Sequence, residues 1–256
     1  MSGPGSSLRA KAAAAWRWTW FGAEALAAAL SPSTYTPRIR ALAARQVLSS
    51  AGQVLPGFVA VCAVLSWLLI GIVEATARDF GLSGYSLDLF VRLLVLELIP
   101  LFVALFVALR SGAALGTEVA LMRVRGELDA PGGAVEPLRA ELLPRGIGVA
   151  ASVLALTAIG MLVALVIAYV GIYGFSPWGH AAYSRVIGQV LGPAELVGLA
   201  IKVGFFAVAV AVIPVAAGLG APRAMASVPE AAPHGLVRIF VTLALVEAGS
   251  IALKYA

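Results

Sequence analysis

Two charged side chains inside a long apolar stretch are the first candidates for chemistry. Arg92 and Glu97 interrupt the run from Leu89 to Leu109. An unpaired charge inside a bilayer costs about 3 kcal/mol or more, so such residues pair, reach the interface or border a wet path. Their spacing of five residues is not the i to i+4 spacing of neighbours on an α-helix. We therefore expect Glu97 to pair with another helix or face a wet cavity, and Arg92 to extend to the membrane surface.

The role of Glu97 stays open between two interpretations. In one, its carboxylate is part of a polar translocation path. In the other, it makes a buried packing bond between helices. Lys202 and Glu247 lie near the ends of later apolar stretches. For these two we expect side chains that extend to the headgroup region.

Motifs for other kinds of chemistry are missing from the sequence. There is no GxxxxGK[ST] phosphate-binding loop and no GxSxG nucleophile elbow. His180 and His234 are not at metal-ligand spacing. The single cysteine, Cys62, allows no internal disulfide. We therefore expect no catalytic residue and no metal site in this chain.

The elements that hold Arg92 and Glu97 must be membrane helices. Hydrophobic residues make up 61% of the 256-residue chain and charged residues 12%, and the mean hydropathy is +0.97. A soluble domain carries about 25% charged residues. This composition excludes a water-soluble enzyme and a disordered chain. The net charge of +5 comes from basic residues that flank apolar stretches, which indicates membrane topology and argues against a nucleic-acid partner.

Stretches of about 20 apolar residues predict five membrane-spanning helices. They cover approximately residues 54–76, 89–109, 147–173, 196–219 and 236–254. Lys and Arg are concentrated ahead of the first stretch and between the second and third. This asymmetry places the N-terminus and the 110–145 loop in the cytoplasm, so five spans put the C-terminus outside.

Two segments outside these spans have patterns of their own. Trp16, Trp18 and Trp20 lie in an Ala-rich stretch, which predicts an interfacial helix on the cytoplasmic leaflet. The segment from Met122 to Ala130 is polar with mixed charges and precedes Pro131. It predicts a short cytoplasmic helix that docks into a partner, or alternatively a solvated connector. The fold class is thus all-α integral membrane, with an N-terminal cytoplasmic and interfacial segment (residues 1–50) and one transmembrane domain (residues 51–256).

The stretch from Glu97 to Arg145 resembles the signature of the MlaE-type permease family. Members of this family are the membrane subunits of ABC transporters that move phospholipids between the bacterial inner and outer membranes. The matching residues, in chain order, are Glu97-Leu-Ile-Pro100, Ala108-Leu-Arg110-Ser-Gly112, Glu118, Met122, Glu127-Leu-Asp129-Ala130, Glu136-Pro137 and Leu143-Pro144-Arg145. The sequence departs from the family pattern at Leu96, where many members carry Arg, and at Ile99, where the family has Gly.

The resemblance implies partners, a location and site residues. It implies a homodimer in the bacterial inner membrane, two cytoplasmic ABC ATPases that bind ATP and Mg²⁺, a periplasmic MCE-domain protein, a phospholipid substrate and a small cytoplasmic accessory subunit. No cofactor is expected on this chain itself. The implied ATPase-coupling residues are Met122, Arg123, Arg125, Glu127, Leu128, Asp129 and Ala130, and the candidates for a lipid path or buried polar set are Arg92, Glu97, Pro100 and Arg110.

Two other classes of function remain as alternatives. One is a secondary transporter or channel that works without ATP and uses Glu97 and Arg92 as a polar relay. The other is a scaffold for a membrane complex that transports nothing. Co-purification of an ATPase with a phosphate-binding loop would separate the permease from both.

Overall fold

The computed structural model describes residues 55–126, 142–220 and 228–255. The predicted interfacial helix with Trp16, Trp18 and Trp20 lies outside the described residues, as do Glu127, Leu128, Asp129 and Ala130 of the predicted docking helix. Within the described ranges the protein is helical and has no strand.

Five helices in the described ranges are long and apolar enough to cross a membrane, which confirms the predicted number. They are α3 (Leu55–Asp79), a continuous helix over Ser83–Val124, α8 (Leu143–Tyr173), α10 (Pro193–Gly220) and, within α11 (Val228–Tyr255), the part Gly235–Lys254. Four of them match the predicted spans closely. The second continues 15 residues beyond its predicted end at Leu109, because small and apolar residues carry on past Arg110.

The second span is built from α-helical and π-helical parts. After the turn η3 (Ser83–Tyr85) come α4 (Ser86–Phe90), the π-helix η4 (Val91–Leu98), α5 (Ile99–Val107), the π-helical turn η5 (Ala108–Gly112) and α6 (Ala113–Val124). In η4 the Ile99 N–H donates to the Leu94 carbonyl, five residues back. Pro100 follows at once and has no N–H to continue the i to i−4 pattern. The wider turn is a local adjustment that such a proline tolerates.

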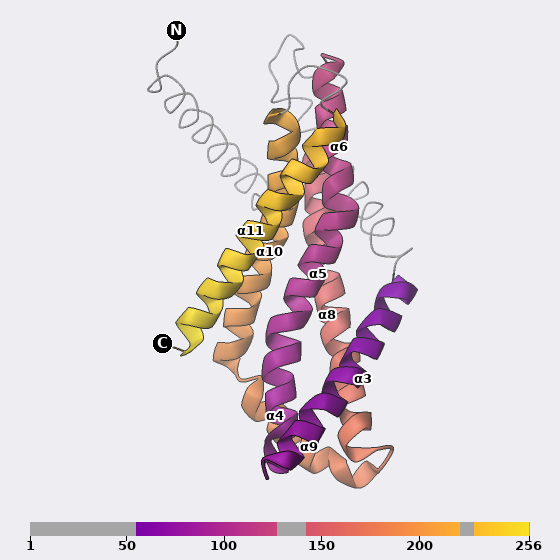
Figure 1. Ribbon diagram of the computed structural model, residues 1–256, viewed down its shortest axis with the longest axis vertical. Coiled ribbons are helices and arrows are strands. Elements are labelled where there is room, and N and C mark those ends of the chain that lie inside the picture. Colours follow the sequence, from indigo (N-terminus) through magenta and orange to yellow (C-terminus); the bar gives the residue numbers. More distant parts are fainter. Residues whose placement is uncertain (1–54, 127–141, 221–227, 256) are drawn as a thin grey trace.

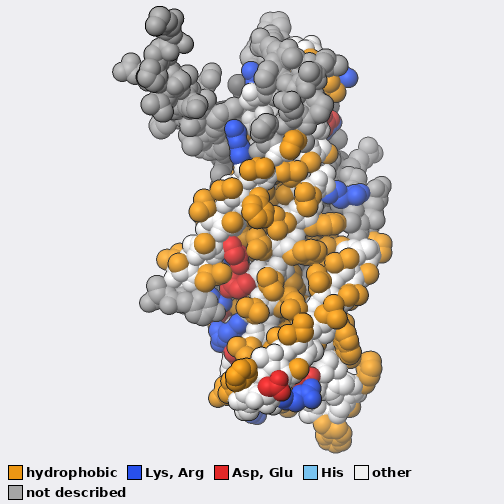
Figure 2. Space-filling view, in the orientation of Figure 1, with side chains coloured by type: hydrophobic (Ala, Val, Ile, Leu, Met, Phe, Trp, Pro, Cys, Tyr) orange, Lys and Arg blue, Asp and Glu red, His pale blue; other side chains and the backbone are white. Residues whose placement is uncertain are grey.

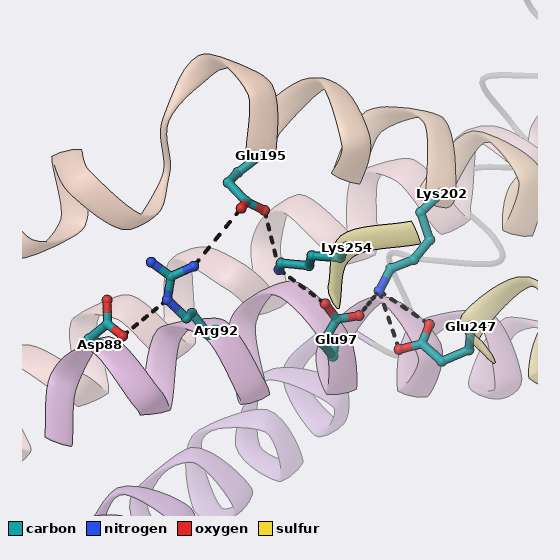
Figure 3. Close-up of polar contacts among 7 residues, drawn as sticks. All are labelled: Asp88, Arg92, Glu97, Glu195, Lys202, Glu247 and Lys254. Carbon is teal, nitrogen blue, oxygen red and sulfur yellow. Dashed lines mark hydrogen bonds and ion pairs between the residues drawn. The ribbon is translucent and has the colours of Figure 1, made fainter. Parts of the chain in front are cut away.

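The π-helix changes which side chains share a face. Its hydrogen bonds join residues five apart, so residues at that spacing lie nearly above one another. Arg92 and Glu97 are at this spacing inside η4. Both side chains extend towards α10 (Figure 3), where each meets a charged residue of that helix.

The second span packs against two helix pairs, which also contact each other through α8 and α10 (Figure 1). On one side α8 packs against α3 and α5, and on the other α10 packs against α11 and α6. The crossing of α6 and α10 is close because it is made by glycines. A Cβ on Gly218 would lie 2.5 Å from the Gly116 carbonyl oxygen, and one on Gly116 would lie 3.2 Å from the Pro214 carbonyl oxygen. The small residues Gly112 and Gly116 thus serve packing within one chain.

The two ends of the bundle are made by different connections. We call one side of the bundle the α9 end. There α3 reaches its last residue, and η8 (Pro177–Gly179) and α9 (His180–Val190) connect α8 to α10. Tyr183 of α9 donates a hydrogen bond to the Leu165 carbonyl of α8 at 2.8 Å. Burial, together with the neighbouring Tyr173, raises the pKa of Tyr183 to about 12. We call the opposite side the α6 end. There α6 and α10 reach their last residues and α8 begins.

Large apolar side chains cover much of the outside (Figure 2). Trp67 of α3, Leu162 of α8, and Phe240 and Leu245 of α11 are all more than half exposed. Exposed apolar surface of this extent on long helices is suited to lipid, not water. The protein is a multi-pass membrane protein.

Candidate functional site

A buried ion cluster joins three spans in the half of the bundle nearer the α9 end. Lys202 of α10 contacts Glu97 of η4 and Glu247 of α11. We call Glu97, Lys202 and Glu247 the inner trio. Lys202 lies nine residues after the start of α10, a rise of about 14 Å along the helix. The ammonium is therefore well inside the span, and its side chain is only 4% exposed.

The inner trio sets two carboxylates against one ammonium. Lys202 donates to Glu97 Oε2 and to Glu247 Oε1, the second at 3.3 Å. Glu247 Oε2 lies 3.2 Å from the same ammonium but is buried without a hydrogen-bond partner among the described residues. Because two carboxylates share one cation, a further positive group close by stabilises the trio.

Lys254, in the last turn of α11, supplies that positive group. Its ammonium lies 3.3 Å from Glu97 Oε1 and 3.2 Å from Glu195 Oε2 at the start of α10. Glu195 Oε1 in turn lies 3.9 Å from Arg92, whose Nε donates to Asp88 Oδ2 at 3.0 Å. We call Asp88, Arg92, Glu195 and Lys254 the outer quartet.

The trio and the quartet form one chain of alternating charges (Figure 3). Its order is Asp88, Arg92, Glu195, Lys254, Glu97, Lys202 and Glu247. The side chains of Asp88, Arg92 and Glu195 are about one third exposed, whereas Glu97 and Glu247 are 12% exposed. This chain of charges therefore runs from a solvent-accessible outer part into the apolar interior. Such an arrangement can accept a polar group from outside and hold it at membrane depth.

The expectation that Glu97 pairs with another helix is confirmed by its contact with Lys202. The expectation for Lys202 and Glu247 was wrong. They do not extend to the headgroups but point inwards and pair with each other. Closeness to a span end in the sequence says nothing about which face of the helix carries the side chain. On α10 the Lys202 position faces the second span, so pairing there replaces contact with the interface.

Lys254 and Glu195 were missed as site residues by the sequence reasoning. Both lie at ends of apolar stretches, where a charged residue is ordinary. One signal was present in retrospect, since Glu195, Lys202, Glu247 and Lys254 are spaced seven apart in two pairs of opposite charge. A spacing of two helical turns puts both members of a pair on one face.

Comparison with known proteins identifies the chain's relatives. Residues 43–252 match the family model described as Permease MlaE. The chain belongs to the MlaE permease family. It is also 27% identical over 217 residues to a probable ABC transporter permease protein of Rickettsia conorii, a match that covers 82% of each chain.

Two further candidates of this MlaE-family permease lie on the second span. Pro100 is buried directly after η4 and marks the return from π-helical to α-helical geometry. Arg110 lies in η5 and is exposed. Arg110 is therefore not part of a buried polar set. Among the described residues, it makes no contact with the charge chain around Glu97. Of the four candidates, the structure joins only Arg92 and Glu97, through Glu195 and Lys254.

The predicted docking helix does not begin as a separate element at Met122. Met122 and Arg123 form the last turn of α6, and Arg125 caps that helix. Gly126 follows with a φ of 75°, a left-handed conformation that ends helices and favours glycine. Met122 is buried against Val119, Leu142 and their neighbours, so its side chain packs within the permease. Arg125, in contrast, is exposed at the α6 end.

A second ion pair strengthens the α6 end of the permease. Glu118 of α6 contacts Arg145 of α8, and both side chains are more than one third exposed. A small apolar cluster lies beneath, made by Leu115, Val119, Met122, Leu142 and Val215. The residues that flank the segment between Gly126 and Leu142 therefore lie next to a packed apolar cluster of α6, α8 and α10.

Proposed function

We propose that this protein is the permease subunit of an ABC transporter that moves phospholipids between the inner and outer membranes of a bacterium. Membership of the MlaE permease family and the similarity to a probable ABC transporter permease support the transporter class. The observation that carries the lipid assignment is the charge chain from Asp88 to Glu247, a polar strip that enters an otherwise apolar bundle from one end. A lipid headgroup needs such a strip to move at membrane depth.

The division of labour in the proposed complex follows from what the chain contains. Its sequence has no phosphate-binding loop, so a cytoplasmic ATPase would bind ATP and Mg²⁺ and supply the energy. Two permease copies would form the membrane part, and a periplasmic MCE-domain protein would receive or deliver lipid at the α9 end. A small cytoplasmic accessory subunit belongs to the same expectation. The permease would lie in the inner membrane with the α6 end in the cytoplasm.

The basic residues near the α6 end support this orientation. Arg125 and Arg145 lie at the α6 end together with Arg123, and the sequence that precedes α3 adds Arg38, Arg40 and Arg45. At the α9 end, Arg78 pairs with Glu74 and Arg92 pairs with Asp88. An excess of Arg and Lys is typical of the cytoplasmic side.

Reconstituted transport tests the proposed function. The permease, purified with its ATPase in vesicles that hold a fluorescent phospholipid, should move the lipid to an acceptor when ATP is present. A variant ATPase that cannot hydrolyse ATP is the control. Equal lipid movement without hydrolysis would favour the ATP-independent transporter or channel. The absence of any co-purifying ATPase and of any lipid movement would favour the scaffold.

Glu97→Gln tests the assignment of Glu97 to the lipid path. Neutralising this carboxylate weakens its contacts with Lys202 and Lys254 and should lower the transport rate per folded permease. Glu74→Gln, which neutralises a carboxylate of α3 outside the charge chain, should not. A Glu97→Gln permease with a lower thermal midpoint but an unchanged rate per folded molecule would make Glu97 a structural residue only.

A further inference from the structure

The outer quartet differs from the inner trio in exposure and in how it is held. Lys202, Glu97 and Glu247 are almost enclosed. Asp88, Arg92 and Glu195 are about one third exposed, and Lys254 lies between the two groups at 17%. Charges with partial access to solvent exchange partners more easily than buried ones, because water compensates for a contact that is lost. The outer quartet is therefore the part of the charge chain that an incoming headgroup meets first.

The quartet presents both signs of charge in alternation. Arg92 lies between Asp88 and Glu195, at 3.0 and 3.9 Å, and Lys254 lies 3.2 Å from the other oxygen of Glu195. A zwitterionic phospholipid headgroup carries a phosphate and an amine a few bonds apart. Arg92 and Lys254 match the phosphate, and Glu195 and Asp88 match the amine, so such a headgroup can replace internal contacts by equivalent ones.

The whole charge chain has one carboxylate more than it has cations. Among the described residues that form it, four are acidic and three are basic. With all four carboxylates ionised, an anionic headgroup adds a further negative charge to this surplus and is repelled. A zwitterionic headgroup adds no net charge. Repulsion of this kind discriminates between ligands that otherwise have the same shape and the same phosphate.

We propose that the outer quartet is a selectivity site that admits zwitterionic phospholipids and rejects anionic ones. The amine is held by Glu195 and Asp88, and the phosphate by Lys254 and Arg92. Glu195 is the main specificity-determining residue because it contacts both cations of the quartet. This inference rests on the proposed function and adds to it the charge class of the lipid.

The experiment uses the permease–ATPase complex and two lipid probes. The complex is incubated with vesicles of equal phosphatidylethanolamine and phosphatidylglycerol, reisolated, and the phospholipids bound per permease are counted by mass spectrometry. The wild type should hold phosphatidylethanolamine in excess by about five-fold, the factor that corresponds to ~1 kcal/mol. Glu195→Lys should invert this ratio because it turns the surplus negative charge into a positive one.

Two other variants keep the result interpretable. Glu195→Gln removes the surplus without adding a cation, so it should bring the ratio close to one even where Glu195→Lys folds poorly. Glu74→Lys makes the same charge change on α3, at a carboxylate of similar exposure that pairs only with Arg78 in the structure's described contacts. It should keep the wild-type ratio.

The failure of this inference is distinct from the failure of the proposed function. Equal amounts of both lipids on the wild type, or an unchanged ratio in both Glu195 variants, would overturn the selectivity site while leaving phospholipid transport in place. A wild-type complex that retains no phospholipid and moves none would instead overturn the proposed function, and the selectivity site with it.

Discussion

Lys202 of α10 and Glu97 of η4 form an ion pair although 105 residues separate them in the sequence. The pair joins the second and fourth membrane-spanning helices at a depth where water is scarce. Glu247 adds the fifth span to the same ammonium. One lysine therefore holds three helices together, and its removal should have a larger effect than the loss of a surface charge.

The first prediction concerns this lysine. Lys202→Met should lower the free energy of unfolding by about 3–5 kcal/mol, because two buried carboxylates lose their shared cation. Thermal unfolding in detergent measures the effect. Arg145→Met is the matched control, since it breaks the exposed pair with Glu118 and should cost less than about 1 kcal/mol. Equal losses in the two variants would show that the depth of the trio has no energetic consequence.

The second prediction concerns the crossing of α6 and α10. Gly218→Ala should destabilise the protein by about 1–3 kcal/mol, because its Cβ would lie 2.8 Å from Val119 Cβ as well as against the Gly116 carbonyl. Gly204→Ala, on the same helix but with no atom within 4 Å of the new Cβ, should be neutral or raise stability by up to about 1 kcal/mol. The reverse order of the two thermal midpoints would refute the close crossing.

The third prediction concerns orientation. With Cys62 replaced by Ala, single cysteines at Ser83 and Ser184, which are exposed at the α9 end, should react from outside with a maleimide that cannot cross the membrane. A cysteine at Gly132, in the stretch between α6 and α8, should react only after permeabilisation. Ser86 lies close to Ser83 but is buried, so a cysteine there is a useful negative control. Labelling of the Gly132 cysteine in intact cells would reverse the proposed topology.

The fourth prediction concerns coupling to the ATPase. Replacing Glu127 and Asp129 together by Lys should reduce both the amount of ATPase that co-purifies and ATP-driven transport. The reversed charges would meet an ATPase surface that is complementary to acidic side chains. Membrane insertion should be unaffected, as judged by the yield of monodisperse permease. The double change Glu136→Lys and Glu141→Lys, in the same stretch but outside the proposed coupling residues, is the control. Full transport by the Glu127 and Asp129 variant would make this segment a solvated connector.

The sequence by itself determined the membrane-spanning helices and the family. Each span is a local property, because about 20 consecutive apolar residues are enough to exclude water from a helix. The run from Glu97 to Arg145 carried the family resemblance, and the match over residues 43–252 confirmed it. That Glu97 needs a partner could also be predicted, since an isolated charge at that depth is costly.

Only the tertiary structure decided which residues are the partners of Glu97. The contact of Glu97 with Lys202 depends on the rotation and height of α10 relative to the second span, and neither can be obtained from the hydropathy of one segment. The same holds for Lys254 and Glu195, whose contacts with Glu97 and Arg92 depend on how α10 and α11 pack against the second span. The π-helix η4 was equally hidden, although it turns Arg92 and Glu97 to one side. Hydrophobicity adds up residue by residue along a chain, whereas an ion pair exists only once the helices have packed.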